Sequence, residues 1–230
     1  MLLFSKKYNY SLKYHPKSGC STLRIIFLEC HRNELNKRDQ GCNHHNINTL
    51  FKKPNKSQPV FTLNIVRNPY ERLVSTFIDK VCGGEHINVV GRRLNLSTIT
   101  FFHFVKLLLK YHRKKKKLKG IEGHLARQTD NYQETDIIIK LENLEQELLY
   151  HYDRPETQEL LPIIKKHIKK KYNQSSKNFQ SKHFVGLTSY SIDFKGPWSN
   201  YKCFYNEDIK NMVDEIYDKE FRIFGYPKTL

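Results

Sequence analysis

Between a short alternating segment and an apolar run, the chain reads Lys13-Tyr14-His15-Pro16-Lys17-Ser18-Gly19-Cys20-Ser21-Thr22-Leu23-Arg24. The alternating segment, residues 8–12, predicts a strand, and the apolar run that begins at Leu23 predicts a buried helix. Gly19 permits a tight turn between them because glycine enters positive φ without strain. Residues 8–35 therefore predict a strand, a loop and a helix.

This predicted loop has the properties of an anion-binding site. Ser21 and Thr22 are expected to cap the helix, and the unpaired N–H groups of a helix N-terminus favour negative charge. Lys17 adds a mobile positive charge beside them. The alternative interpretation is an ordinary strand–helix turn with a surface lysine.

A second strand–helix junction follows in residues 60–81. The apolar, β-branched residues 60–66 predict a central parallel strand, and Asn68 and Pro69 predict the start of a helix. Arg67 stands at the carboxyl end of the strand, where open α/β sheets bind their ligands, and its planar guanidinium suits a phosphate. Ser75, two turns into the helix, can point its hydroxyl toward the same crevice. An ordinary salt bridge is the alternative role for Arg67.

The rest of the chain extends the α/β pattern. Residues 136–141 predict another buried strand, residues 206–227 an amphipathic C-terminal helix capped by Asn206, and the Lys-rich residues 162–183 a loop. We find no internal repeat and no second domain. We therefore expect a single α/β domain over residues 1–230, with a central parallel sheet flanked by helices.

The charge of the chain limits its partners. Lys and Arg number 40 against 23 Asp and Glu, which gives a net charge of +17. This excess favours an anionic partner such as a nucleotide, a nucleic acid, an acidic glycan or a membrane surface, although an AT-rich genome also produces many lysines. No segment reaches the roughly 20 apolar residues that span a bilayer, and the five cysteines lack the spacing of a disulfide framework. As written, the chain is expected in the cytoplasm, or in the Golgi lumen if it is an incomplete or trimmed product.

The two junctions resemble motifs of the sulfotransferases that use 3′-phosphoadenosine 5′-phosphosulfate (PAPS). Residues 16–22 look like the 5′-phosphosulfate loop of that family, and residues 66–75 look like its 3′-phosphate segment. The amino-acid sequences of these motifs are closest to those of the carbohydrate sulfotransferases of the chondroitin/dermatan and uronyl 2-O types. Residues 123–128, 136–145 and 217–226 are similar to later segments of these enzymes. The resemblance implies a P-loop-like sulfotransferase fold.

The resemblance also implies roles for individual residues. Lys17 would neutralise the leaving 5′-phosphate oxygen, and Arg67 and Ser75 would bind the 3′-phosphate. The loop would hold the 5′-phosphate through backbone N–H groups and hydroxyls; its residues are Ser18, Gly19, Cys20, Ser21 and Thr22. The base is either His124 or one of the pair His44 and His45, and no metal is required.

The acceptor expected from this resemblance is a carbohydrate or another hydroxyl compound, neutral or acidic, without nucleic acid or a membrane span. Leu125 stands where the family has Trp, which changes the expected acceptor pocket. Two alternatives stay open, namely an inactive homologue that binds PAPS or another anion and a basic nucleic-acid-binding protein. The latter would use the Lys runs at 113–117 and 165–171.

Overall fold

The structure is a computed structural model that describes residues 1–36, 47–51, 61–82, 100–121, 123–130, 132–134, 137–151, 153, 155–168 and 201–230. His44 and His45 lie outside the described residues. The chain forms two compact units. The first unit comprises Met1–Arg67 and Tyr132–Asn173, and the second comprises Asn68–Asn131 and Gln174–Leu230.

The first unit contains a mixed sheet of four strands. The strands are β1 (Leu2–Ser5), β2 (Tyr10–Tyr14), β3 (Phe61–Val66) and β4 (Ile137–Lys140), in the order β1-β2-β3-β4. The three strands β2, β3 and β4 run parallel, whereas β1 pairs antiparallel with β2. The α/β class is confirmed, and the predicted parallel sheet gains an antiparallel edge strand. The carboxyl ends of β2, β3 and β4 therefore lie at one edge of the sheet.

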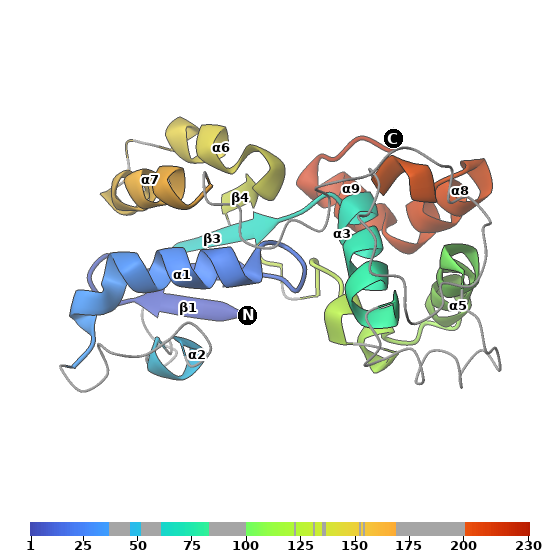
Figure 1. Ribbon diagram of the computed structural model, residues 1–230, viewed down its shortest axis with the longest axis horizontal. Coiled ribbons are helices and arrows are strands. Elements are labelled where there is room, and N and C mark those ends of the chain that lie inside the picture. Colours follow the sequence, from blue (N-terminus) through green and yellow to red (C-terminus); the bar gives the residue numbers. More distant parts are fainter. Residues whose placement is uncertain are drawn as a thin grey trace. The chain divides into compact units, whose positions relative to one another are not determined.

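Helices complete the core of the first unit (Figure 1). They are α1 (Cys20–His31), α2 (Ile47–Leu50), α6 (Leu144–Tyr150) and α7 (Pro155–Ile168), with 3-10 turns at Arg32–Glu34 and Leu141–Asn143. Helix α1 packs on α7, which packs on α6, and α6 contacts β4. The Phe27 ring of α1 lies 6.0 Å from the Tyr10 ring of β2, so α1 is anchored to the sheet.

The apolar face of the sheet follows from the two-residue period of its strands. Leu12 pairs with Leu63, and Tyr14 with Ile65, in the register of β2 and β3. Side chains at these alternate positions share a face and are buried in the core of this unit. The intervening positions are polar, and Lys13 stands opposite Asn64.

The second unit, as far as it is described, is helical. Its elements are α3 (Pro69–Thr76), a π-helical turn at Phe77–Cys82, α5 (Phe101–Arg113), 3-10 turns at Leu118–Gly120, Gly123–Leu125 and Tyr201–Phe204, α8 (Glu207–Ile216) and α9 (Asp218–Phe224). Helix α5 packs on α8. The rings of Phe77, Phe101 and Phe204 contact one another at centroid distances of 5.2–6.4 Å. Asn68 caps α3 by accepting from the N–H of Tyr70, as the sequence predicts.

Three predicted elements differ from the structure. The strand predicted at residues 8–12 is β2, which begins at Tyr10 because the turn after β1 extends to Asn9, whose φ is 52°. Part of the predicted loop at 162–183 is the end of α7, whose Leu161 and Ile164 are buried. The predicted C-terminal helix of 206–227 is two helices, because α8 ends where Tyr217 is buried and α9 begins after it.

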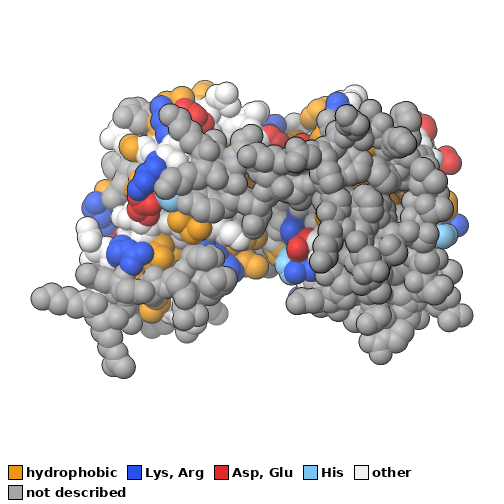
Figure 2. Space-filling view, in the orientation of Figure 1, with side chains coloured by type: hydrophobic (Ala, Val, Ile, Leu, Met, Phe, Trp, Pro, Cys, Tyr) orange, Lys and Arg blue, Asp and Glu red, His pale blue; other side chains and the backbone are white. Residues whose placement is uncertain are grey.

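On the face shown in Figure 2, the basic side chains of the described residues do not form a single patch. Lys and Arg side chains there lie scattered among acidic and hydrophobic ones. Among the described helices, none has both the length and the apolar character needed to cross a membrane.

Candidate functional site

The loop between β2 and α1 is a tight turn whose backbone is held by His15. The N–H of Ser18 donates to the His15 carbonyl (3.0 Å), and the Cys20 thiol donates to the same oxygen (2.9 Å). Lys17 and Gly19 both have left-handed conformations, with φ of 64° and 74°. The chain therefore reverses direction within a few residues of the end of β2.

Gly19, and not Ser21 or Thr22, is the N-cap of α1. The prediction that Ser21 and Thr22 cap the helix is wrong, because both lie inside its first turn. The first intrahelical hydrogen bond runs from the N–H of Leu23 to the Gly19 carbonyl (2.9 Å). Among the described residues, no side chain caps this end of α1, and the first turn of the helix contains no acidic residue. Because the N–H groups before Leu23 point out of the helix end, this turn can bind an anion.

Arg67 joins the second motif to the first. Its Nη1 donates to the backbone carbonyl of Lys17 at 2.9 Å, although the two residues are 50 positions apart in the chain. This contact follows from the parallel pairing of β2 and β3, which ends both strands at one edge of the sheet. The structure thus brings together the lysine and the arginine that the sequence selected separately.

A buried pair fixes the base of the loop to β3. The Nε2 of His15 lies 2.9 Å from the Oδ1 of Asn64, and both side chains are buried. A buried polar group is costly unless it is hydrogen-bonded, so this pair restrains the start of the loop. The sequence analysis missed it, and the available signal was an Asn inside an otherwise apolar strand.

The sequence analysis also missed Lys140, a third cation at this edge. In the register of β3 and β4, Lys140 stands opposite Val66, the residue before Arg67. The residue after it, Leu141, packs against the loop. A Cβ placed on Gly19 would lie 3.0 Å from the Cδ1 of Leu141. The ends of β2, β3 and β4 therefore all contribute to the surroundings of the loop.

Replacing Gly19 with alanine is expected to lower the free energy of unfolding by about 1–2 kcal/mol, the cost of a left-handed conformation in a residue with a Cβ. The close approach of Leu141 adds to this cost. Urea unfolding of the variant and of the parent protein measures the difference. Gly120→Ala is the matched control, because nothing lies within 4 Å of a Cβ built there. Equal unfolding free energies for Gly19→Ala and Gly120→Ala would contradict the prediction.

Two further predicted site residues, Ser75 and His124, belong to the second unit. Ser75 lies on α3 and His124 in the 3-10 turn Gly123–Leu125, and both are half-buried. Their positions relative to the loop of the first unit stay predictions.

A buried network holds the segment that carries His124. Arg72 donates to the carbonyls of His124 (3.3 Å) and Ala126 (3.1 Å), and its Nη2 donates to Glu220 (3.2 Å). Glu220 also accepts from the backbone N–H (2.7 Å) and the side-chain amide (2.8 Å) of Gln128. The Arg72 and Glu220 side chains are almost fully buried, and removing one partner of such a pair costs about 3–5 kcal/mol. The sequence analysis missed this network because charged residues are usually at the surface.

The network has a tyrosine beside it. The guanidinium carbon of Arg72 lies 5.4 Å from the ring centre of Tyr217. Burial raises the pKa of the Tyr217 hydroxyl to about 12, although Arg72 has the opposite effect. Tyr217 is therefore a neutral packing residue at physiological pH. In the described part of the chain, no three His, Cys, Asp or Glu side chains lie close enough together to bind a metal ion.

Comparison with known proteins identifies a family that the chain matches. A sequence model of the sulfotransferase family matches residues 1–227 of the chain. Searches of curated proteins and of solved structures found no match to the chain. The matched range includes residues of both units.

Proposed function

The chain belongs to the sulfotransferase family, and on that premise we propose that it transfers a sulfuryl group from PAPS to a hydroxyl group of a carbohydrate acceptor. The acceptor oxygen attacks the sulfur and forms a new S–O bond. The bond between the sulfur and the 5′-phosphate oxygen breaks, and the hydroxyl proton passes to a base. Such an in-line displacement depends on positioning and on neutralisation of the leaving oxygen.

The observation that carries this proposal is the contact between Arg67 and Lys17. One motif of the donor site supplies the lysine and the other supplies the arginine, and a hydrogen bond of 2.9 Å joins them. We assign the leaving 5′-phosphate oxygen to Lys17 and the 5′-phosphate itself to the N–H groups of residues 19–22, since the N–H of Ser18 already donates to the His15 carbonyl. We assign the 3′-phosphate to Arg67, whose planar fork binds two oxygens at once, with Ser75 as a further donor.

The base in this proposal is a histidine. A neutral imidazole can accept the hydroxyl proton near neutral pH. His124 is held by the buried network through its own carbonyl, and His44 and His45 are the alternatives that the resemblance favours. Loss of turnover with retained donor binding in His124→Ala, or in the double variant of His44 and His45, identifies which of them acts.

The test of the proposal is transfer of radioactive sulfate from labelled PAPS to a panel of neutral and acidic saccharides. We expect a labelled saccharide and an equal amount of the desulfated donor, 3′-phosphoadenosine 5′-phosphate (PAP). Binding of PAP without transfer to any acceptor would instead indicate an inactive homologue. Absence of PAP binding together with tight binding of an oligonucleotide would indicate a nucleic-acid-binding protein.

A further inference from the structure

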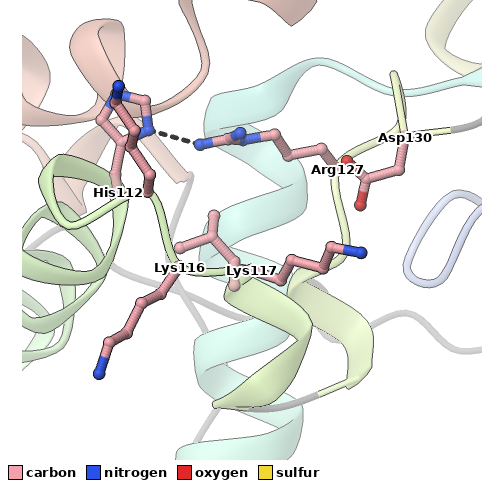
Figure 3. A pocket seen from close by; sticks show the side chains of 7 residues that line it. His112, Lys116, Lys117, Arg127 and Asp130 are labelled. Carbon is pink, nitrogen blue, oxygen red and sulfur yellow. Dashed lines mark hydrogen bonds between the residues drawn. The ribbon is translucent and has the colours of Figure 1, made fainter.

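The end of α5, the segment after it and the turn at residues 127–130 line a cavity of about 210 Å³ in the second unit, and the cavity is open to solvent. Lys115 and Lys117 come from the segment after α5, and Arg127 and Asp130 come from the turn. Figure 3 shows Arg127 directed toward His112 and Lys117 extended beneath Arg127 and Asp130. The lining thus combines four cationic residues, Lys115, Lys116, Lys117 and Arg127, with the carboxylate of Asp130.

Within the part of the chain that the structure describes, no carboxylate forms an ion pair with Arg127, Lys115 or Lys117. The neighbouring Arg113, in contrast, binds Glu215 at 2.7 Å. The Nη2 of Arg127 donates to the Nδ1 of His112 (2.5 Å), and burial together with Arg127 lowers the pKa of His112. His112 is therefore neutral, and the positive charge of the cavity is left for an anion to balance.

The backbone supports the same interpretation. Helix α5 ends in a Schellman motif, in which the N–H of Lys115 donates to the His112 carbonyl and the N–H of Lys116 to the Tyr111 carbonyl. The residue at the left-handed position of this motif is usually glycine, but here it is Lys115, with a φ of 53°. A lysine at a position that favours glycine is locally unfavourable, and such strain is concentrated at functional sites.

The lining favours a sugar over a bare phosphate chain. Lysine and arginine bind carboxylate or sulfate oxygens. The ionised Asp130 carboxylate can only accept hydrogen bonds, so it can bind a sugar hydroxyl but repels a phosphodiester. The cavity lining has no Phe, Tyr or Trp among the described residues, so it offers no surface on which a nucleobase can stack. The volume is smaller than the roughly 300–1,000 Å³ of pockets for drug-sized ligands, and suits one residue of a longer chain.

We propose that the cavity formed by Lys115, Lys117, Arg127 and Asp130 binds one acidic sugar residue of an anionic saccharide. The cations bind its carboxylate or sulfate group, and Asp130 accepts from a ring hydroxyl. That this saccharide is the acceptor of the reaction rests on the proposed function, whereas the binding itself does not.

The test measures binding of a fluorescently labelled hexasaccharide of alternating glucuronate and N-acetylgalactosamine by fluorescence anisotropy, without PAPS. We expect Lys115→Gly with Lys117→Gln to weaken binding at least about tenfold, the effect of losing a hydrogen bond to a charged group. Lys115→Gly also relieves the left-handed backbone, so the melting temperature of this variant should not fall. The matched control replaces the exposed Lys114 and Lys119, which do not line the cavity, with glutamine and removes the same charge.

Several results would overturn the proposal. Equal weakening in the cavity variant and in the control variant would show diffuse attraction by the positive surface. Equal binding of a hexasaccharide whose carboxylates have been reduced to alcohols would show that the carboxylates do not contribute to binding. Tighter, cavity-dependent binding of a single-stranded oligonucleotide would assign the site to nucleic acid.

Cavity-dependent saccharide binding without sulfuryl transfer would support this site and contradict only the proposed function.

Discussion

Replacing Lys17 with alanine is expected to lower the turnover of sulfuryl transfer by about 10²–10³-fold. Enzymes lose about this much turnover when one preorganised donor that stabilises charge in the transition state is removed. The ammonium group acts on the oxygen that gains negative charge as the sulfur leaves, so the loss should fall on kcat. The Lys17 carbonyl, which accepts from Arg67, is kept in this variant. Initial-rate kinetics with varied PAPS measure kcat and KM separately.

Two variants separate this role from an effect on folding. Lys17→Gly removes the same charge and also relieves the left-handed φ of 64°, so its turnover should fall as far while its melting temperature does not. Lys6→Ala removes an exposed lysine of the same unit and should leave turnover unchanged. Unchanged kcat in both Lys17 variants would refute the assignment.

Arg67→Ala should weaken the binding of PAP about 100-fold, the sum of two hydrogen bonds to a charged phosphate. Arg67 also supports the loop through the Lys17 carbonyl, so some loss is expected for any nucleotide that occupies it. Adenosine 5′-phosphate lacks the 3′-phosphate and reports that loss alone. The informative quantity is the ratio of the two affinities, measured by isothermal titration calorimetry, and it should fall at least about tenfold.

Arg67→Lys tests whether binding of PAP depends on the planar shape of the guanidinium as well as on its charge. Lysine keeps the charge but loses the planar fork, so it should restore PAP binding only in part. If Arg67→Ala weakens both nucleotides by the same factor, Arg67 only supports the loop and the 3′-phosphate is bound elsewhere.

The candidate loop could be predicted because its signals are local. Gly19 follows a predicted strand and precedes an apolar run, and Arg67 stands directly after a β-branched strand. The cap of α1 could not be predicted in the same way, because Gly19, Ser21 and Thr22 are all acceptable N-caps by composition. The backbone of the turn selects Gly19, whose φ is 74°.

Elements that depend on distant partners were missed or displaced. Helix α7 contains Pro162 and a Lys-rich end, and it is helical because Leu161 and Ile164 reach the core of the first unit. The edge strand β1 exists through its pairing with β2. Glu220 is buried because Arg72 and Gln128 satisfy it, and residues so far apart in sequence give no local signal.

The sequence by itself determined the α/β class, the parallel strands and the position of the loop, because strand alternation, helix starts and glycine turns depend on neighbouring residues. The tertiary structure decided which of these segments meet. It placed Arg67 on the Lys17 carbonyl, His15 on Asn64, and Lys140 at the same sheet edge. Strand order and register bring such groups together, and both result from burial of one apolar face by the whole unit rather than from any short segment.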